Sequence, residues 1–284
     1  MNWVFLGDSL TEGVGSNRIS YVSELVTRIR SARYENNVHE LRLRHVDPNG
    51  FDRFVEFNVA GKIDVDAGQF ASDLWLWNLA CEGQTIETDV KWLPLIRTLR
   101  PELVVIFRGS LESIVRPATL HEGSWPWWVP SSWKSYAAMD PRCYFSTTWW
   151  RRAKQQLVDT TKQRMRMKLL GRAPGRPLLD LEPFAAHLTI LVRRLQEVNT
   201  RVLILGPLPV DDATFPGSPK YFESVNAKLH EIANAEGVDF FDWGTELKSK
   251  ATRDELFYRD GFHPNLAGAT ALAEILHSRL CPQR

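Results

Sequence analysis

The stretch Trp3-Val4-Phe5-Leu6-Gly7-Asp8-Ser9-Leu10 joins an apolar run directly to a turn that carries a serine. An apolar run this short, ended by a glycine, predicts a buried β-strand. The turn after it would place the Ser9 hydroxyl at the carboxyl edge of a sheet. In open α/β sheets this edge is where ligands bind. The stretch therefore predicts an α/β fold with a candidate functional group at its binding edge.

Similar apolar runs recur along the chain and alternate with segments of helical spacing. The runs that predict strands of the main sheet are 4–6, 74–79, 103–107, 202–205 and 238–242. The segments between them predict helices over 21–29, 86–99, 185–198, 221–235 and 266–280. Residues 30–72 are less regular, and within them 54–59 alternates like a strand. This alternation of strands and helices predicts a parallel sheet with helices on both faces.

Between residues 111 and 181 the alternation stops. This region holds a basic run over 151–168 and six of the chain's 11 tryptophans: Trp125, Trp127, Trp128, Trp133, Trp149 and Trp150. A stretch this long without α/β rhythm is typical of an inserted segment, and so many aromatic residues argue against disorder. We expect one domain over 1–284, in which 111–181 is an inserted cap or lid that is helical over 148–169.

Two interpretations of the tryptophans remain open. They can pack as a small core of the insertion, or their flat rings can stack on sugar rings. We expect most of them to form the core, and Trp127 and Trp128 to line the substrate cleft. The basic run is interpreted as a solvated helix face rather than a nucleic-acid site.

The composition narrows the class of protein. The 284 residues are 44% apolar, as in soluble globular proteins. The net charge of +1 gives no overall electrostatic reason to expect a nucleic acid or an anionic membrane as a partner. No apolar run is long enough to span a membrane. The three widely spaced cysteines (Cys81, Cys143 and Cys281) and seven dispersed histidines predict neither a disulfide framework nor a metal site, and we expect no cofactor. Because a strand begins at the first residues, we expect no secretory signal. The unpaired cysteines indicate a reducing, cytoplasmic location.

A second polar motif, Asp260-Gly-Phe-His263, lies near the other end of the chain. Its spacing puts both side chains on one side of a single turn, so that the carboxylate can orient the imidazole toward a third group. Ser9 alone is a poor nucleophile and needs such a base. Each motif by itself is also compatible with an ordinary turn that caps a helix. Together they predict a catalytic triad of Ser9, His263 and Asp260, because a triad is defined by roles rather than by chain order.

The chain resembles the SGNH (GDSL) hydrolase superfamily of esterases, lipases and carbohydrate O-deacetylases at four points in order. They are Gly7-Asp8-Ser9-Leu10, Asn78-x-x-x-x-Gly83, Gly109 and Asp260-x-x-His263. The resemblance implies a flavodoxin-like three-layer α/β/α fold, with Ser9 as nucleophile, His263 as base and Asp260 as its orienting group. It also implies an oxyanion hole formed by the backbone N–H groups of Ser9 and Gly83, with Gly61 as the alternative glycine.

The third block departs from the family pattern. The family has Gly-x-Asn-Asp there, with the Asn side chain as a further oxyanion donor, whereas this chain has Gly109-Ser110-Leu111-Glu112. Loss of one such donor typically lowers the rate about 10²–10³-fold. The candidate substitutes are Ser110, Arg108 and a residue of the insertion, although Arg108 could instead form a salt bridge with Glu112. We expect the substrate site to include Asp8, Arg108 and Glu112 besides the two tryptophans.

These features predict a serine ester hydrolase. The expected reaction removes short acyl groups, O-acetyl above all, from a carbohydrate or glycoconjugate through an acyl-enzyme on Ser9. If the insertion excludes water, an acyltransferase to a sugar hydroxyl on the same triad is the alternative. If the loss of the Asn donor has impaired catalysis, a carbohydrate-binding protein is the third interpretation.

Overall fold

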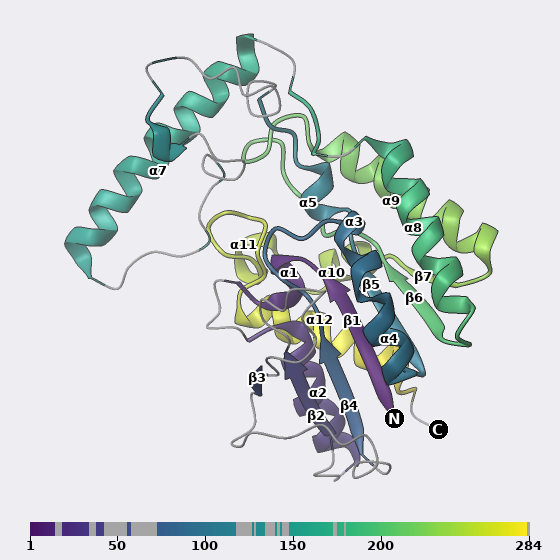
Figure 1. The fold of residues 1–284 in the computed structure, drawn as a ribbon. Helices are drawn as coiled ribbons and strands as arrows, with labels where there is room; N and C mark the ends of the chain where they lie inside the picture. The colour runs from purple at the N-terminus through teal and green to yellow at the C-terminus, as the bar shows by residue number, and fades with distance from the viewer. Residues whose placement is uncertain are drawn as a thin grey trace.

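The structure of the chain is a computed structural model. It describes residues 1–14, 19–33, 38–42, 56–57, 73–117, 127, 129–133, 140, 143, 148–172, 175–178 and 180–282. The strands in these ranges form one seven-stranded sheet, with helices packed on both of its faces (Figure 1). The predicted three-layer α/β/α fold is therefore confirmed.

The strands follow one another across the sheet in the order β3-β2-β4-β1-β5-β6-β7. Neighbouring strands are parallel, except that β2 and β3 at one edge are antiparallel. Counted in chain order without β2 and β3, the other five strands have the flavodoxin-like order 2-1-3-4-5. The strand bounds are β1 (Asn2–Gly7), β2 (Val38–Arg42), β3 (Glu56–Phe57), β4 (Leu74–Asn78), β5 (Leu103–Phe107), β6 (Arg201–Leu205) and β7 (Asp239–Phe241).

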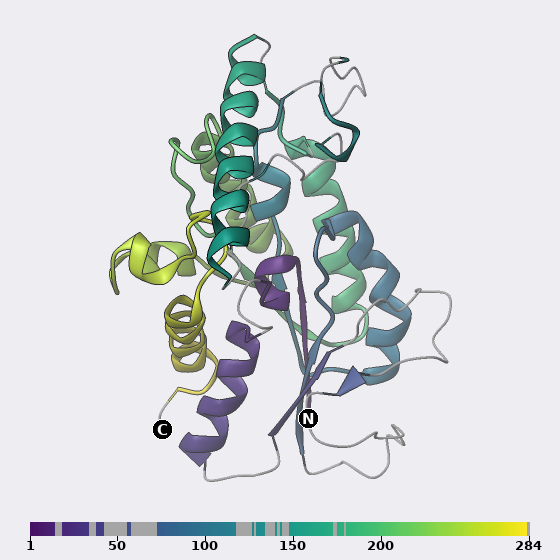
Figure 2. The same ribbon diagram turned by 90° about the vertical axis from the view of Figure 1, so that its left-hand side faces the viewer.

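Side chains of the central strands alternate between two apolar cores, as in Trp3 and Phe5 of β1 against Val4 and Leu6. The first core is closed by α2 (Tyr21–Arg33), α10 (Trp243–Lys248) and α12 (Leu266–Leu280). The second is closed by α3 (Ile86–Asp89), the 3-10 helix η1 (Val90–Trp92), α4 (Leu93–Leu99), α8 (Leu181–Gln196) and α9 (Pro219–Glu236). Figure 2 shows the sheet edge-on between these two layers. Because both faces are covered, β5 is apolar throughout rather than alternating.

The direction of the chain across the sheet changes at β1. From β1 it passes to β2 and β4 on one side, and it then returns to β5 on the other side. Such a switch point leaves a crevice at the carboxyl ends of the two strands, where α/β proteins bind ligands. Ser9 follows β1 closely, and Arg108 directly follows β5. The fold thus brings the first and third sequence blocks to one crevice.

The strand β2 lies in the less regular stretch 30–72, at residues where the sequence pattern does not indicate a strand. Two of its polar side chains, Glu40 and Arg42, are buried, and Arg42 Nε donates to Glu40 Oε1 over 2.7 Å. Because the pair satisfies both charges inside the protein, the segment does not show the apolar pattern of a buried strand. Of the predicted strand 54–59, the described residues include Glu56–Phe57, which form β3.

The segment 111–181 leaves the α/β body and returns to the same place. Arg116 and Arg176 exchange two backbone hydrogen bonds of 2.9 Å, so the two ends of the segment lie side by side. Near it and within it the chain forms α5 (Ser110–Ser113), the 3-10 helix η2 (Ser131–Trp133) and α7 (Trp149–Arg172). The helix expected over 148–169 is therefore present as α7, which extends outward from the sheet and its helices (Figure 1).

Candidate active site

Ser9 is the first residue of a short helix, α1 (Ser9–Glu12), that begins just after β1. Asp8 is the N-cap, and its carboxylate accepts a hydrogen bond from the Leu10 N–H over 2.9 Å. A Cβ atom on Gly7 would lie 2.0 Å from the Thr11 Oγ1, so this close approach of strand and helix requires glycine. The turn leaves the Ser9 hydroxyl at the carboxyl edge of the sheet, where the sequence predicts it.

Asp260 and His263 lie in the loop between α11 (Arg253–Leu256) and α12. The Asp260 side chain is buried, and its Oδ1 accepts the backbone N–H groups of Phe262 and His263 over 3.0 and 3.1 Å. Its Oδ2 lies 2.7 Å from His263 Nδ1. Asn265 then caps α12 by accepting the Gly268 N–H over 3.0 Å. These bonds fix the orientation of the imidazole relative to the sheet.

The Nε2 atom of His263 lies 2.9 Å from the Oγ of Ser9. Because a carboxylate is only an acceptor, Nδ1 donates to Asp260, and the neutral ring then offers Nε2 as an acceptor for the Ser9 hydroxyl. A serine nucleophile, its base and an orienting carboxylate require this order of donors. The structure therefore brings together the three side chains that the two sequence motifs pair.

Gly83, the predicted second oxyanion donor, lies in the exposed turn after β4 and has a φ of 78°. This left-handed conformation is one that glycine adopts without strain. The turn is tied to the helix that begins with Ser9, because Glu12 Oε2 accepts the Glu82 N–H over 2.6 Å. The alternative glycine, Gly61, lies outside the described residues.

Two buried side chains, those of Arg108 and Glu112, hold the far end of the turn that contains Gly83. Arg108 Nη1 donates to the Gln84 carbonyl over 2.7 Å, and Glu112 Oε1 accepts the Ile86 N–H over 3.0 Å. The other oxygen of Glu112 accepts the Gly109 N–H over 3.0 Å. One carboxylate thus joins the turn after β4 to the turn after β5.

Beneath these turns Arg108 forms an ion pair with Asp89 of α3, and both side chains are fully buried. Arg108 Nε donates to Asp89 Oδ2 over 2.6 Å, and its Nη2 contacts the other oxygen. Burial acts to lower the pKa of Arg108, but the Asp89 carboxylate outweighs it and raises that pKa, so the guanidinium stays charged. A salt bridge between Arg108 and Glu112 was the alternative, and it is wrong because Asp89 occupies the guanidinium.

The burial of this network bears on the predicted substrate residues. The exposed fractions of Asp8, Arg108 and Glu112 are 1%, 0% and 1%, so in this structure these side chains are buried and support the turns. Burial raises the pKa of Glu112 to about 7, although Arg108 acts in the opposite direction. Burial also raises the pKa of Asp8. Near neutral pH the Glu112 carboxyl therefore carries a proton in part of the molecules.

The remaining predicted residues have different surroundings. Ser110 is buried, and its hydroxyl makes no hydrogen bond to any residue that the structure describes. Leu111, at the family's Asn position, is half-buried. Trp127, which the sequence predicts to line the substrate cleft, is 91% exposed, so its ring faces solvent. Trp128 lies outside the described residues.

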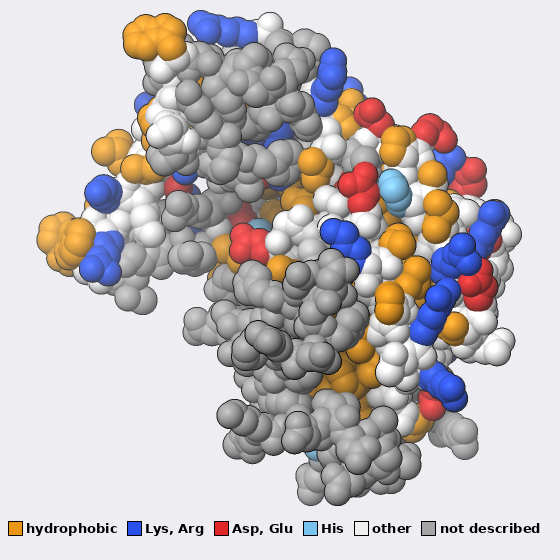
Figure 3. Space-filling model, viewed as in Figure 1, with side chains coloured by type: hydrophobic (Ala, Val, Ile, Leu, Met, Phe, Trp, Pro, Cys, Tyr) orange, Lys and Arg blue, Asp and Glu red, His pale blue; other side chains and the backbone are white. Residues whose placement is uncertain are grey.

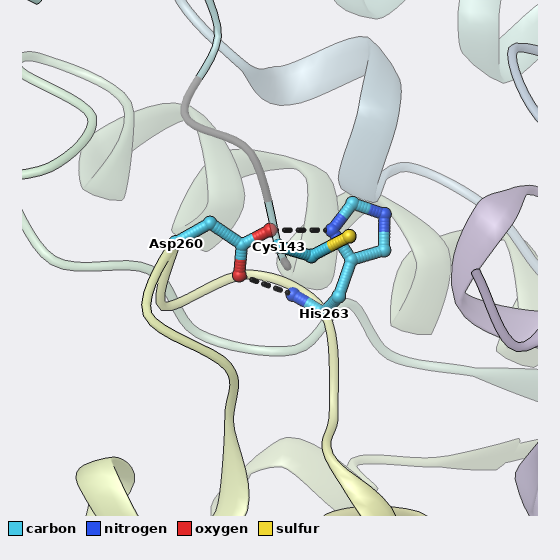
Figure 4. A group of neighbouring side chains, drawn as sticks. All are labelled: Cys143, Asp260 and His263. Carbon is cyan, nitrogen blue, oxygen red and sulfur yellow. Dashed lines mark hydrogen bonds and ion pairs between the residues drawn. The ribbon is translucent and has the colours of Figure 1, made fainter. Parts of the chain in front are cut away.

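Sequence reasoning missed Cys143, a buried residue of segment 111–181. Its Sγ, a carboxylate oxygen of Asp260 and a ring nitrogen of His263 all lie within 4.8 Å of one another (Figure 4). These atoms are of types that bind metals, but Asp260 and His263 are already hydrogen-bonded to each other, and we assign no metal to them. Cys143 of segment 111–181 therefore lies beside Asp260 and His263. No sequence signal could reveal it, because it depends only on tertiary packing.

Residues 146–271 match the model of the GDSL-like lipase/acylhydrolase family. This region contains Asp260 and His263, and the Gly7–Leu10 motif lies outside it as a further point of agreement. The family match and the Gly7–Leu10 motif together support assignment of the chain to the SGNH (GDSL) hydrolases, as an ester hydrolase of the serine type. Its third block has Leu111 in place of Asn.

Solved structures of esterases and lipases have a similar fold. A mutant of Axe2, an acetyl-xylooligosaccharide esterase from Geobacillus stearothermophilus, has a TM-score of 0.55 at 13% identity, over 99% of this chain and 94% of that chain. TesA has a TM-score of 0.54 at 14% identity, over 99% of both chains. A lipase/acylhydrolase from Enterococcus faecalis has a TM-score of 0.51 at 16% identity, over 100% of both chains. At these identities the likeness concerns the fold alone. A search of curated protein sequences finds no match to the chain.

Proposed function

We propose that this SGNH hydrolase removes short acyl groups, O-acetyl above all, from a carbohydrate or glycoconjugate, with Ser9, His263 and Asp260 as its catalytic triad. The observation that carries the proposal is the hydrogen-bonded series from Asp260 Oδ2 to His263 Nδ1 (2.7 Å) and from His263 Nε2 to Ser9 Oγ (2.9 Å). Both distances lie within the reach that proton transfer requires.

The reaction follows from the order of donors. Ser9 Oγ attacks the ester carbonyl carbon while its proton passes to His263 Nε2. The imidazolium is stabilised by Asp260, and it then protonates the departing sugar oxygen, which leaves an acyl-enzyme on Ser9. His263 next accepts a proton from water, whose oxygen attacks the acyl carbon. The acid leaves as the proton returns to Ser9.

Two backbone N–H groups are the proposed oxyanion donors, those of Ser9 and Gly83. The support for Gly83 is the way its turn is held: Glu12 fixes the residue before it, Arg108 the carbonyl after it, and Glu112 the N–H of Ile86. A donor positioned before the reaction stabilises the charge without reorganisation. Leu111 cannot donate from its side chain, so Ser110, whose buried hydroxyl has no described partner, is our candidate for the third donor.

The carbohydrate part of the proposal rests on the exposed Trp127 ring, which can stack on a sugar. Axe2, which is similar to this chain in fold, is an acetyl-xylooligosaccharide esterase, and a sugar substrate of that class would suit such a ring. The odd, spread cysteines fit a reducing setting, so the cytoplasm is our proposed location.

The test uses aryl acetate, butyrate and octanoate together with acetylated xylo-oligosaccharides, on wild type, Ser9→Ala and the surface control Ser224→Ala. We expect wild type and the Ser224→Ala variant to hydrolyse acetyl esters fastest, and a fluorophosphonate probe to label both. The Ser9→Ala variant should lose labelling and turnover. Turnover that survives Ser9→Ala would refute the triad. A preference for octanoate, or no release of acetate from the oligosaccharides, would refute the substrate class alone.

An acyltransferase is the second candidate, and one observation favours it. Cys143 of segment 111–181 lies against Asp260 and His263, so the segment lies close enough to exclude water from the acyl-enzyme. With an aryl acetate as donor, added xylose or xylo-oligosaccharides would then be acetylated faster than acetate is released. Release of free acetate that acceptors do not reduce would exclude this function.

A further inference from the structure

The helix α7 differs in charge from the rest of the molecule. Over Trp149–Arg172 it carries eight Lys or Arg residues and one acidic residue, a net charge of +7, whereas the whole chain has +1. The remainder of the protein is therefore negative. Figure 1 shows α7 as a long rod that stands away from the sheet. A strongly basic rod on an otherwise acidic protein is a feature that the catalytic proposal does not use.

The inner face of α7 is held by polar contacts. Asp159 pairs with Arg259 over 3.0 Å, and Arg166 Nη2 donates to the Val115 carbonyl over 2.9 Å. A small apolar cluster completes this face: Val129, Met165 and Leu169, with Trp133 packed against them. The helix therefore sits on the body through charges as much as through apolar contacts, and its apolar residues are not all turned inward.

The outer face of α7 exposes large apolar side chains. The exposed fractions are 79% for Trp149, 51% for Trp150, 70% for Leu157 and 45% for Met167. Trp150 and Leu157 are seven residues apart and lie on one face. Figure 3 shows apolar side chains gathered at one end of α7, with basic side chains beside them. Large apolar groups exposed along one helix face are typical of an interaction surface.

Basic residues continue the same face toward the other end of the helix. Arg164 and Lys168 follow Trp150 and Leu157 at helical spacing, and both are exposed. Tryptophan and leucine beside Lys and Arg on one helix face is the pattern of helices that lie in the interface of a membrane. In such helices the apolar side chains insert at the boundary between headgroups and acyl chains, and the Lys and Arg side chains bind lipid phosphates.

Charge and side-chain type favour this occupant over two others. A second copy of α7 would bring +7 against +7, which opposes pairing through this face. The phosphates of single-stranded nucleic acid would pair with the Lys and Arg side chains, and its nucleobases would stack on the indole rings. It offers nothing for Leu157 and Met167, which cannot stack on a nucleobase. Because no helix among the described residues has the length and apolarity to cross a bilayer, contact through α7 would be contact with the surface only.

We propose that the outer face of α7 docks on the surface of a membrane that contains anionic phospholipid. Trp149, Trp150, Leu157 and Met167 insert at the level of the headgroups, and Arg164 and Lys168 bind lipid phosphates. This role is independent of the esterase proposal, because none of these residues belongs to the triad or to the turns around it.

The test is co-sedimentation of the full chain with vesicles of phosphatidylcholine, alone or mixed with phosphatidylglycerol. We expect binding to the mixed vesicles that weakens as salt is raised. Each Lys or Arg near an anionic surface contributes a factor of about five, so Arg164→Gln with Lys168→Gln should weaken binding about 25-fold. Leu157→Ser should weaken it about tenfold. The matched controls are Ile190→Ser, an exposed apolar residue of α8, and Lys248→Gln with Lys250→Gln, and both should bind as wild type.

Several results would overturn the proposal. One is equal binding to both vesicle types, and another is binding that the α7 variants leave unchanged. Binding of a homopolymeric single-stranded RNA but not of vesicles, lost in the Arg164 and Lys168 variant, would assign the surface to nucleic acid. A dimer in sedimentation that Leu157→Ser dissociates would assign it to a second copy. The Ser9→Ala variant should bind vesicles as wild type does. The vesicle experiment therefore tests the membrane proposal even if the esterase proposal fails.

Discussion

The Oγ of Ser9 and the Nε2 of His263 lie 2.9 Å apart, although 254 residues separate them in the chain. The sheet is what joins them, because Ser9 follows the central strand β1 and His263 precedes α12, which packs on the same sheet. The third side chain, Asp260, bonds to His263 from within the same loop.

Replacing Asp260 by Asn tests the orienting role. The amide cannot stabilise the imidazolium and can hold the wrong tautomer, so we expect kcat to fall by roughly three to four orders of magnitude with little change in KM. The measurement is steady-state hydrolysis of an aryl acetate, with the exposed Asp254→Asn as the control. A fall of less than about tenfold would show that Asp260 has no such role.

Replacing Leu111 by Asn tests the missing oxyanion donor. If the side chain reaches the position of the family's Asn, a third hydrogen bond to the oxyanion should raise kcat by up to about 10²–10³-fold. Leu111→Ala is the control, because it removes the leucine without adding a donor. Equal kcat values in the two variants would mean that another group already donates there. A combined Ser110→Ala variant would then show whether that group is Ser110.

The ion pair of Arg108 and Asp89 should be costly to break. Arg108→Gln leaves the Asp89 carboxylate buried without its cation, so the free energy of unfolding should fall by about 3–5 kcal/mol. The double variant Arg108→Met with Asp89→Leu removes both charges, so its free energy of unfolding should fall by less than that of Arg108→Gln. Arg201→Gln, which breaks the exposed pair with Asp239, should cost no more than about 1 kcal/mol. Urea unfolding measures all three, and a double variant as unstable as Arg108→Gln would contradict the expectation.

Glu112 should make stability depend on pH. Burial raises its pKa from an ordinary 4.5 to about 7, so between these values the folded state binds more protons than the unfolded state. Stability from this group is therefore lost as the pH rises through that interval. Glu112→Gln does not titrate, so its stability relative to wild type should improve as the pH rises from about 5 to about 8. Urea unfolding across this range is the measurement, and a difference that stays constant with pH would contradict the prediction.

Much of the fold was predictable because its signals are local. The run of β5 is apolar on both faces, and the helices α8, α9 and α12 show their apolar face every third or fourth residue. The strand β2 escaped prediction because Glu40 and Arg42 are buried as a pair, and a pair of charges has no apolar period. The local apolar pattern predicts which side chains are buried away from water. It does not predict a buried segment in which two charged side chains pair with each other.

The sequence by itself determined the sheet and the motifs that carry Ser9, Asp260 and His263, since each follows from residue types at short spacing. Tertiary structure alone decided the rest. The tertiary structure pairs Arg108 with Asp89 and places Cys143 beside His263. It also lets the Glu112 carboxylate accept hydrogen bonds from the turn after β4 and the turn after β5. It also left the apolar side chains of α7 facing outward. The physical reason is that burial and charge pairing depend on which distant segments meet, and spacing along the chain does not contain that information.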